Sequence, residues 1–576
     1  MSASYNSHAR VFTVGLGGAA GDGIREAGLH FGELLKHQGY EICLTSYYPS
    51  LIRGGHNYSR LSFSREPVFA DHRSIDLLVA VNAESVRFHA HELAPDAIVL
   101  VESAYLSDVK DVAPQAIAIP MKDIGAEKGG PKAAYPSAAL GAFALALGVS
   151  EADLPGVLAA ALSDLAGGKA INTTIAEEGY RRAREAGVPD RADMREGARV
   201  EHPGDLIEGN KAVGEGFLAA GLEYYIAYPM TPATSLLHHL AKRAMEGKLK
   251  TVHPEDEITV INMALGVAYA GKRVAIGTAN GGFALMEEAF AFAGVAELPL
   301  AIMVSQRQGP ATGVPTHTGQ SDLRFIVHAG HGEFPRLVIA PGDPEEAFNA
   351  AAAALNLAWK YQIPAIVLLD KHLSETYRTI AVDPSKVAIE RGKIGAGGAD
   401  YQRYAFADDG ISPMVVPGTP ATCVKATSYE HDQFGIATDE PEKVKAMHDK
   451  RFAKLQGLAS EFASHDTVKT YGDPASDTVV LFWGSTKGAV LEAAKGISRP
   501  VKFVQILWMT PFDTERVTRE LAGAKRIILV EGNRTAQLAG LLREHTGIVV
   551  TDTILRYDSE AFEPEALMQD LNRLLA

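Results

Sequence analysis

The feature that most constrains the fold is the alternation of strand-like and helix-like segments between residues 209 and 370. Short apolar runs, among them EYYIAY, RVAIGTA and LAIMVSQ, are each followed by a longer stretch with helical periodicity. Strands that alternate with helices in this way are typical of βαβ units, in which parallel strands form one sheet and helices cover its faces. This part of the chain is therefore predicted to be an α/β unit with a parallel sheet.

The length of the chain requires more than one hydrophobic core, because 576 residues exceed what a single core supports. A strand, a glycine-rich turn and a helix from about Asp22 to His37 open the chain, and strands alternate with helices again in its last part. We therefore expect a multidomain α/β protein. Its domains are predicted at residues 1–195, 200–385 and 470–576, with a connecting segment at residues 386–469.

The charge and hydropathy of the chain exclude several kinds of partner. The net charge of −15 is spread along the sequence without basic blocks, which argues against a nucleic-acid surface. No uncharged apolar run reaches the roughly 18 to 20 residues that a membrane-spanning helix needs, and the N-terminus lacks the apolar core of a signal peptide. We predict a cytoplasmic protein that binds neither nucleic acid nor membrane.

Cysteine chemistry is limited in this chain. Its two cysteines, Cys43 and Cys423, are far apart in the sequence. A disulfide framework, or a zinc or iron–sulfur site with cysteine ligands, needs more cysteines than that. Any iron–sulfur cluster would therefore have to belong to another chain.

Two segments of the N-terminal part have the composition of anion-binding loops. GLGGAAGDG, from Gly15 to Gly23, lies between a strand and a helix, where glycines and a helix N-terminus can hold a phosphate. A tight turn explains the same residues, and Asp22 places a negative charge where the phosphate would lie. Arg53, beside two glycines, can bind a phosphate or carboxylate or be a solvated arginine in a β-turn. Both interpretations stay open for each segment.

Two segments of the central part place polar side chains directly after predicted strands. The turn YPMTP holds Thr231 between Pro229 and Pro232, which stiffen the backbone. Arg307 begins a long loop that also contains Thr312, Thr316, His317, Gln320 and Asp322. Ligands of parallel sheets collect at the carboxyl ends of the strands, so a ligand-binding role is favoured for this loop.

Three consecutive acidic residues, Glu255, Asp256 and Glu257, precede a predicted helix. Acidic residues in a first helical turn are an ordinary response to the helix dipole. On composition alone this interpretation is favoured, and nothing in the pattern singles out one of the three.

Four segments, taken together and in this order, resemble the alpha subunit of the 2-oxoacid:ferredoxin oxidoreductases. They read GNKAVGEGFLAAGLEYYIAYPMTPAT, PEDEITVINMALGVAYAGKRVAIGTANGGFALMEE, QRQGPATGVPTHTGQSDL and VEGNRTAQLAGLLRE. The N-terminal GLGGAAGDG and YPSLIRGG resemble the gamma domain of that family, here fused ahead of alpha. This order most resembles the two-subunit 2-oxoglutarate:ferredoxin oxidoreductases. The chain departs from the family pattern at Met230, Ala233 and Ala19-Ala20 and in TANGGF, whereas Thr231 is intact.

The resemblance implies a particular fold and chemistry. The three domains would be a gamma-like domain, a pyrimidine-type domain of the thiamine enzymes with a parallel sheet, and a transketolase-C-terminal-like domain. The implied reaction is oxidative decarboxylation of a 2-oxoacid with thiamine diphosphate, in which coenzyme A takes the acyl group and ferredoxin the electrons. In this family Mg²⁺, the diphosphate end and a [4Fe-4S] cluster belong to a separate beta subunit. The resemblance thus implies an (αβ)₂ heterotetramer and no metal site in the present chain.

Cofactor residues follow from the resemblance position by position. Glu257 matches the catalytic glutamate that hydrogen-bonds the aminopyrimidine ring of thiamine diphosphate, and Glu255 is the alternative. Tyr228, Pro229 and Asn280 are likewise expected to bind the cofactor.

Substrate residues are assigned in the same way. Thr231 and Arg307 match the positions that hold the carboxylate of the 2-oxoacid. Arg53 and His317 are the candidates for the second carboxylate of 2-oxoglutarate.

Two alternatives remain at this stage. The same chemistry could act on pyruvate, branched-chain 2-oxoacids or indolepyruvate. In a different class, the chain could be a nucleotide-binding or regulatory protein that keeps the fold without catalysis.

Overall fold

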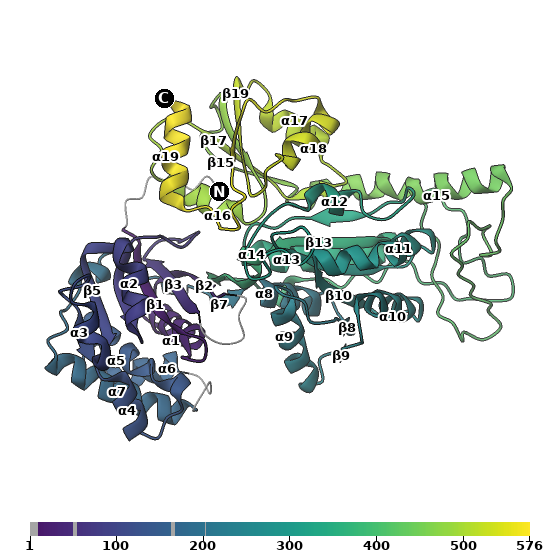
Figure 1. Cartoon of the computed structure of the whole chain (residues 1–576). Helices are drawn as coiled ribbons and strands as arrows, with labels where there is room; N and C mark the ends of the chain where they lie inside the picture. Colours follow the sequence, from purple (N-terminus) through teal and green to yellow (C-terminus); the bar gives the residue numbers. More distant parts are fainter. Residues whose placement is uncertain (1–9, 50–54, 163–167, 202) are drawn as a thin grey trace.

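The computed structural model describes residues 10–49, 55–162, 168–201 and 203–576. It contains three β-sheets, each covered by helices (Figure 1). The multidomain α/β class predicted from the sequence is confirmed. The domain limits stay a prediction, because strands cross them in the ways described below.

The N-terminal sheet has eight strands in the order β6-β5-β4-β1-β3-β2-β14-β7. Their bounds are β1 Phe12–Ala19, β2 Glu41–Tyr47, β3 His56–Ser64, β4 Ile75–Ala80, β5 Leu93–Glu102, β6 Ile117–Ile119, β7 Asp205–Glu208 and β14 Tyr377–Ile380. The helices of this part are α1 Ile24–His37, α2 Ala83–His89, α3 Leu106–Val109, α4 Met121–Glu127, α5 Ser137–Ala146, α6 Leu154–Ala161 and α7 Lys169–Glu185. Strands β1, β4, β5 and β6 are parallel, and the others pair antiparallel. The sequence did not predict β7 and β14, which come from beyond residue 200 and join the central part to this sheet.

The glycine-rich segment is mostly strand, which corrects the predicted turn. Strand β1 continues to Ala19, so the turn comprises only residues 20–23. Asp22 accepts the N–H of Ala19 at 2.8 Å and lies 2.6 Å from Lys132 Nζ. Gly23 has a φ of 75°, and a Cβ there would lie 2.1 Å from the carbonyl oxygen of Ala133. Packing therefore explains Asp22 and Gly23 without a bound phosphate.

The central sheet has seven strands in the order β18-β12-β13-β11-β10-β8-β9. Their bounds are β8 Tyr224–Ile226, β9 Lys250–Val252, β10 Val274–Ala279, β11 Leu300–Gln306, β12 Leu337–Ile339, β13 Pro364–Asp370 and β18 Trp508–Thr510. The helices are α8 Gly209–Ala219, α9 Thr234–Met245, α10 Glu257–Tyr269, α11 Asn280–Val295, α12 Leu323–Val327, α13 Pro344–Tyr361 and α14 Lys371–Glu375. All strands are parallel except β18, which comes from the C-terminal part and pairs antiparallel with β12. The parallel sheet predicted from the alternating pattern is thus confirmed.

The C-terminal sheet has five strands in the order β15-β17-β16-β19-β20. Their bounds are β15 Val468–Gly472, β16 Thr478–Phe482, β17 Lys502–Ile506, β19 Arg526–Glu531 and β20 Asp552–Leu555, and the helices are α16 Thr486–Ala494, α17 Thr514–Leu521, α18 Gln537–Thr546 and α19 Pro564–Leu575. Figure 1 shows this sheet packed above the central one, with α18 near α12. The two sheets share one hydrophobic core, which contains side chains from both.

The segment between the central and C-terminal sheets is an arm fixed by buried charges. Helix α15, Pro441–Ser460, runs beside an irregular stretch and extends away from the body in Figure 1. Lys450 and Lys454 of this helix lie 2.8 and 2.5 Å from the carboxylate of Glu297, and all three are buried. The one carboxylate faces both ammonium groups in the core, so the base of the arm has one defined position.

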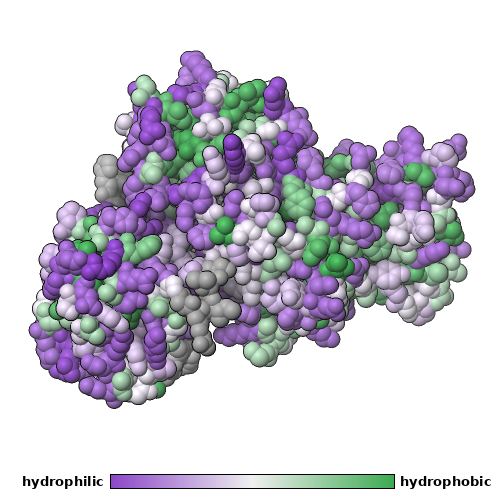
Figure 2. All heavy atoms as spheres, in the orientation of Figure 1, coloured by the Kyte–Doolittle hydropathy of each residue, from purple (hydrophilic) through white to green (hydrophobic). Residues whose placement is uncertain are grey.

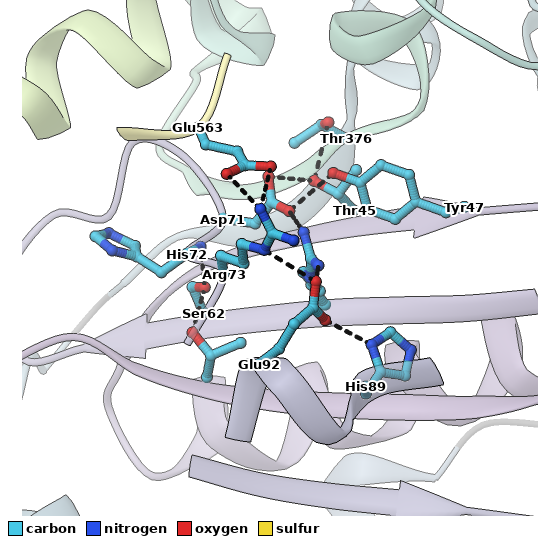
Figure 3. A network of polar contacts seen from close by, with 12 residues as sticks. Thr45, Tyr47, Ser62, Asp71, His72, Arg73, His89, Glu92, Thr376 and Glu563 are labelled. Carbon is cyan, nitrogen blue, oxygen red and sulfur yellow. Dashed lines mark hydrogen bonds and ion pairs between the residues drawn. The ribbon is translucent and has the colours of Figure 1, made fainter. Parts of the chain in front are cut away.

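A polar network connects the N-terminal sheet to the C-terminal part (Figure 3). The guanidinium of Arg73 lies 3.2 Å from Glu92 and 3.2 Å from Glu563. Beside it, His72 Nδ1 lies 2.6 Å from a carboxylate oxygen of Glu565. On the face of the molecule in Figure 2, polar side chains cover most of the surface and apolar ones form small groups. No helix in the described ranges is long and apolar enough to cross a membrane.

Candidate active site

Polar side chains converge where the strand order of the central sheet reverses. From β8 the chain passes to β9 on one side and then to β10 on the other, so the carboxyl ends of β8 and β10 flank a switch point. In open α/β sheets, ligands bind in the crevice outside such a point. The segments of the central part that are predicted to bind ligands follow β8, β9, β10 and β11 directly, so they lie together at the carboxyl ends of these strands.

The turn after β8 is held by its neighbours. Arg307, which follows β11, donates a hydrogen bond from Nη1 to the carbonyl oxygen of Thr231 at 2.7 Å. Asn210 donates from its amide to the carbonyl oxygen of Pro232 at 2.8 Å. The structure therefore brings Arg307 to the backbone of Thr231, the second residue that the family resemblance assigns to the substrate carboxylate.

Arg307 is a buried cation with spare hydrogen-bonding capacity. It is only 6% exposed, and its Nε has no partner within the described part of the chain. Burial lowers the pKa of the guanidinium below its ordinary value. A buried donor without a partner is costly, and a bound anion would satisfy it.

The three consecutive acidic residues occupy three different environments. Glu255 is exposed, whereas Asp256 is the N-cap of α10 and accepts the N–H of Thr259 at 2.7 Å. Glu257 is 4% exposed, and its Oε1 has no partner among the residues that the structure describes. The ordinary helix-capping role therefore belongs to Asp256, and Glu257 is left with a buried acceptor that no residue of the described ranges satisfies.

Glu257 faces the N-terminus of α11. A Cβ built on Gly282 would lie 2.8 Å from Glu257 Oε1 and 2.2 Å from Thr278 Oγ1. Only glycine fits this position, because any side chain would collide with both groups. The hydroxyl of Thr278 is also buried without a partner in the described ranges.

Asn280 links α11 to the loop that carries Arg307. Its Nδ2 donates to the carbonyl oxygen of Arg307 at 3.0 Å and to Asp322 Oδ2 at 2.9 Å. Burial raises the pKa of Asp322 to about 6, and the hydrogen bond from Asn280 opposes that shift. The amide hydrogens of Asn280 are thus used inside the chain, where they fix Arg307 relative to α11.

The remaining predicted site residues are less closely grouped. His317 Nδ1 lies 3.2 Å from Glu560 of the C-terminal part, and this hydrogen bond raises the pKa of the imidazole. Tyr228 is exposed and packs edge-on against the ring of His253, and Pro229 is half-buried on the same turn. Arg53 lies outside the described residues.

Two further buried hydroxyl groups belong to the candidate site. Thr316, on the Arg307 loop, is 8% exposed and its Oγ1 has no partner in the described ranges. Thr278 was not singled out from the sequence, although it is the one hydroxyl in the apolar run RVAIGTA and lies near its carboxyl end. A lone hydroxyl at the end of a parallel strand is the signal that could have found it.

The residues present fit one half of a thiamine diphosphate site. Glu257 offers a buried oxygen that can accept a hydrogen bond from a ring nitrogen, and Gly282 keeps the space beside it free. Among the described residues, no group of three or more His, Cys, Asp or Glu side chains could hold a metal ion.

Two family descriptions match the chain. Residues 215–450 match "Pyruvate flavodoxin/ferredoxin oxidoreductase, thiamine diP-bdg", and residues 13–182 match "Pyruvate ferredoxin/flavodoxin oxidoreductase". Together with the parallel sheet and the buried glutamate, these matches define an oxidoreductase with a thiamine diphosphate-binding domain.

Individual relatives narrow the class. The chain is 32% identical to the 2-oxoacid:ferredoxin oxidoreductase subunit alpha of Sulfolobus sp, across 97% of this chain and 96% of that protein. It is 26% identical to the 2-oxoglutarate synthase subunit KorA of Methanothermobacter thermautotrophicus, across 63% of this chain and 96% of that protein. This chain belongs to the alpha subunits of the 2-oxoacid:ferredoxin oxidoreductases, which confirms the resemblance noted in the sequence.

A solved structure agrees with the whole fold. It is 2-oxoglutarate:ferredoxin oxidoreductase from Magnetococcus marinus with 2-oxoglutarate, coenzyme A and succinyl-CoA bound, and it superposes with a TM-score of 0.86 at 29% identity. The match covers 98% of this chain and 100% of that one.

Proposed function

We propose that this chain is the alpha subunit of a 2-oxoglutarate:ferredoxin oxidoreductase, which converts 2-oxoglutarate and coenzyme A to succinyl-CoA and CO₂ and passes the electrons to ferredoxin. The observation that carries the proposal is the buried group at the switch point, where Arg307 Nε and Glu257 Oε1 both lack partners in the described part of the chain. The choice of 2-oxoglutarate is supported by the full-length likeness to the Magnetococcus marinus enzyme, whose structure holds 2-oxoglutarate and succinyl-CoA.

Glu257 is the proposed catalytic residue. When bound, thiamine diphosphate would supply two things: a nucleophilic carbon for addition to the 2-oxo group, and an electron sink for decarboxylation. Glu257 would accept a hydrogen bond from a nitrogen of the aminopyrimidine ring, and this bond would hold the proton on that ring nitrogen. Asn280 would keep the N-terminus of α11 in place beside it, and Tyr228 and Pro229 would border the pocket from the turn after β8.

Arg307 and Thr231 are the proposed ligands of the substrate carboxylate next to the 2-oxo group. The guanidinium is already fixed by its bond to the carbonyl oxygen of Thr231, so little ordering is needed when an anion binds. The hydroxyl of Thr316 can add a third donor. We propose His317 and Arg53 for the distal carboxylate of 2-oxoglutarate, and the pairing of His317 with Glu560 keeps that imidazole cationic to higher pH.

A second subunit would complete the site. Ile258, Asn262 and Met263 on α10 and Leu285 on α11 are exposed and uncharged, and the two helices are neighbours that border Glu257. We propose that a beta subunit docks on this face and brings the diphosphate end of the cofactor with Mg²⁺ and a [4Fe-4S] cluster. Two such pairs would form an (αβ)₂ heterotetramer that reduces ferredoxin in the cytoplasm.

The test is turnover by the complex reconstituted with its beta subunit. 2-Oxoglutarate is expected to give the highest kcat/KM among 2-oxoglutarate, pyruvate, a branched-chain 2-oxoacid and indolepyruvate. Pyruvate used equally well would overturn the choice of substrate. The Thr231→Ala complex is expected to assemble normally with a raised KM, and loss of assembly would assign the turn to the subunit interface instead. A chain that binds no beta subunit and no thiamine diphosphate would favour the regulatory alternative.

A further inference from the structure

Gln320 joins the Arg307 loop to the C-terminal sheet. This glutamine is 2% exposed, and its backbone N–H donates to the carbonyl oxygen of Gly532 at 2.8 Å. Its Oε1 accepts the N–H of Gly532 at 2.8 Å, and its Nε2 donates to the carbonyl oxygen of Trp483 at 3.1 Å. Asn533 in turn donates from Nδ2 to the carbonyl oxygen of Gln320 at 2.9 Å. One side chain therefore makes hydrogen bonds to two loops of a different sheet.

These two loops flank the switch point of the C-terminal sheet. From β16 the chain passes to β17 on one side, and it later returns to β19 on the other. Trp483 directly follows β16, and Gly532 directly follows β19. The crevice between the carboxyl ends of β16 and β19 is where an open α/β sheet ordinarily binds a ligand. Here Gln320, a side chain from the central part of the same chain, lies in this crevice, and a small cavity lined by Gln320, Thr486 and Gly532 remains beside it.

Two glycines give Gln320 its room. A Cβ on Gly484 would lie 2.6 Å from Gln320 Nε2, and a Cβ on Gly532 would lie 3.0 Å from Gln320 Oε1. Glu531, which is fully buried and directly precedes Gly532, accepts the indole N–H of Trp483 at 2.8 Å and the N–H of Leu538 at 3.0 Å. The crevice is thus a preformed socket whose walls are held by hydrogen bonds.

The loop that the socket holds is the one proposed to bind substrate. It contains Arg307, Thr316 and His317, and it is fixed at its start by Asn280 and at its end by Gln320. Gln537 reinforces the same end by donating to the carbonyl oxygen of Ser321 at 2.6 Å. A loop fixed at both ends keeps its hydroxyl and guanidinium groups in one arrangement.

We propose that Gln320 is a positioning residue, and that the C-terminal sheet uses its ligand crevice as a socket that holds the substrate loop in its binding arrangement. The proposal rests on the proposed role of Arg307 in binding the 2-oxoacid. It gives the C-terminal sheet a defined part in substrate recognition.

The test compares two buried glutamines in the reconstituted complex. Gln505 is also fully buried, and it also joins the C-terminal sheet to the central part, because its Nε2 donates to Glu346 Oε2 at 2.7 Å. Unlike Gln320, it does not lie on the Arg307 loop. Gln320→Leu is expected to raise KM for the 2-oxoacid about tenfold while kcat changes less than about threefold. Gln505→Leu is expected to lower thermal stability and leave KM unchanged. Equal effects of the two variants on KM would overturn the proposal.

A second readout does not depend on the substrate. Hydrogen–deuterium exchange of the amides of residues 308–319 is expected to quicken in Gln320→Leu and to stay at the wild-type rate in Gln505→Leu. Gly532→Ala is a milder variant, because the added Cβ would lie 3.0 Å from Gln320 Oε1 and displace that side chain only slightly. It is expected to raise KM and to quicken exchange, as Gln320→Leu does. Faster exchange with an unchanged KM would mean that the socket works and the proposed substrate role of the loop is wrong. Unchanged exchange in both Gln320→Leu and Gly532→Ala would overturn the socket itself.

Discussion

Glu255, Asp256 and Glu257 allow a test in which three adjacent acidic residues are expected to respond in three ways. Glu255 is exposed, Asp256 caps α10, and Glu257 presents a buried oxygen without a partner in the described part of the chain. The variants are Glu255→Gln, Asp256→Ala and Glu257→Gln, each in the complex with the beta subunit. The first and second serve as controls for the third.

The expected magnitudes follow from these environments. Loss of a proton-transfer group lowers kcat by about 10²- to 10⁴-fold, which corresponds to about 3 to 5 kcal/mol of barrier. Since Glu257 Oε1 accepts no hydrogen bond within the described ranges, Glu257→Gln removes none, so its free energy of unfolding should change less than that of Asp256→Ala. Removal of the cap in Asp256→Ala costs about 1 kcal/mol of stability and leaves kcat nearly unchanged. Glu255→Gln should alter neither quantity.

The assay is reduction of a viologen dye with saturating 2-oxoacid, coenzyme A, thiamine diphosphate and Mg²⁺, together with thermal unfolding of the same samples. Turnover of the Glu257→Gln complex within about threefold of the wild type would refute the assignment. A large loss in Glu255→Gln would move the role to the alternative residue. If Glu257→Gln lost as much stability as Asp256→Ala, the buried carboxyl would be a structural group.

Three further predictions concern other charged groups. Arg307→Lys is expected to raise KM about 10- to 100-fold, because an ammonium group cannot bind the carbonyl oxygen of Thr231 and a carboxylate with the fork geometry of a guanidinium. The control is Arg336→Lys. Arg336 is also buried but lies at the amino ends of the strands, so KM should stay unchanged. Burial lowers the pKa of His72, but the carboxylate of Glu492, 3.5 Å from Nε2, and the hydrogen-bonded carboxylate of Glu565 outweigh it and raise the pKa to about 9. Because this folded-state pKa exceeds the unfolded value of about 6.5, the stabilisation is complete below that pH and is lost as the pH rises through about 9. Denaturant unfolding should therefore show His72→Gln clearly less stable than the wild type at pH 6 and nearly equal to it above pH 9, and a constant difference would contradict the ion pair. Glu297→Gln leaves Lys450 and Lys454 without their buried counter-charge, so it should cost about 3 to 5 kcal/mol, and a melting temperature close to that of the wild type would contradict this.

Much of the fold could be predicted from local patterns. The alternation of apolar runs and amphipathic stretches gave the parallel central sheet, because strand and helix periodicity are read within a few residues of each position. Strands β7, β14 and β18 were not predicted from the sequence. Each is short, and each exists only because a strand from a distant part of the chain offers its edge, which no local pattern encodes.

The candidate site divides in the same way. Sequence position alone placed Thr231 and Arg307 after strands, and the family resemblance indicated Glu257. Packing alone separated Glu257 from Glu255 and Asp256, since the three differ in burial and partners and not in chemistry.

By itself, the sequence determined the class of fold, the order of its parts, and the kinds of side chain that stand at the carboxyl ends of its strands. These properties depend on backbone preferences and periodicity, which act between near neighbours. Only the tertiary structure decided that Arg307 bonds the turn of Thr231, that Glu257 keeps a buried oxygen with no partner in the described part of the chain, and that Gln320 lies in the crevice of another sheet. Those facts depend on contacts between residues that are far apart in the chain, so they exist only once the three sheets have packed together.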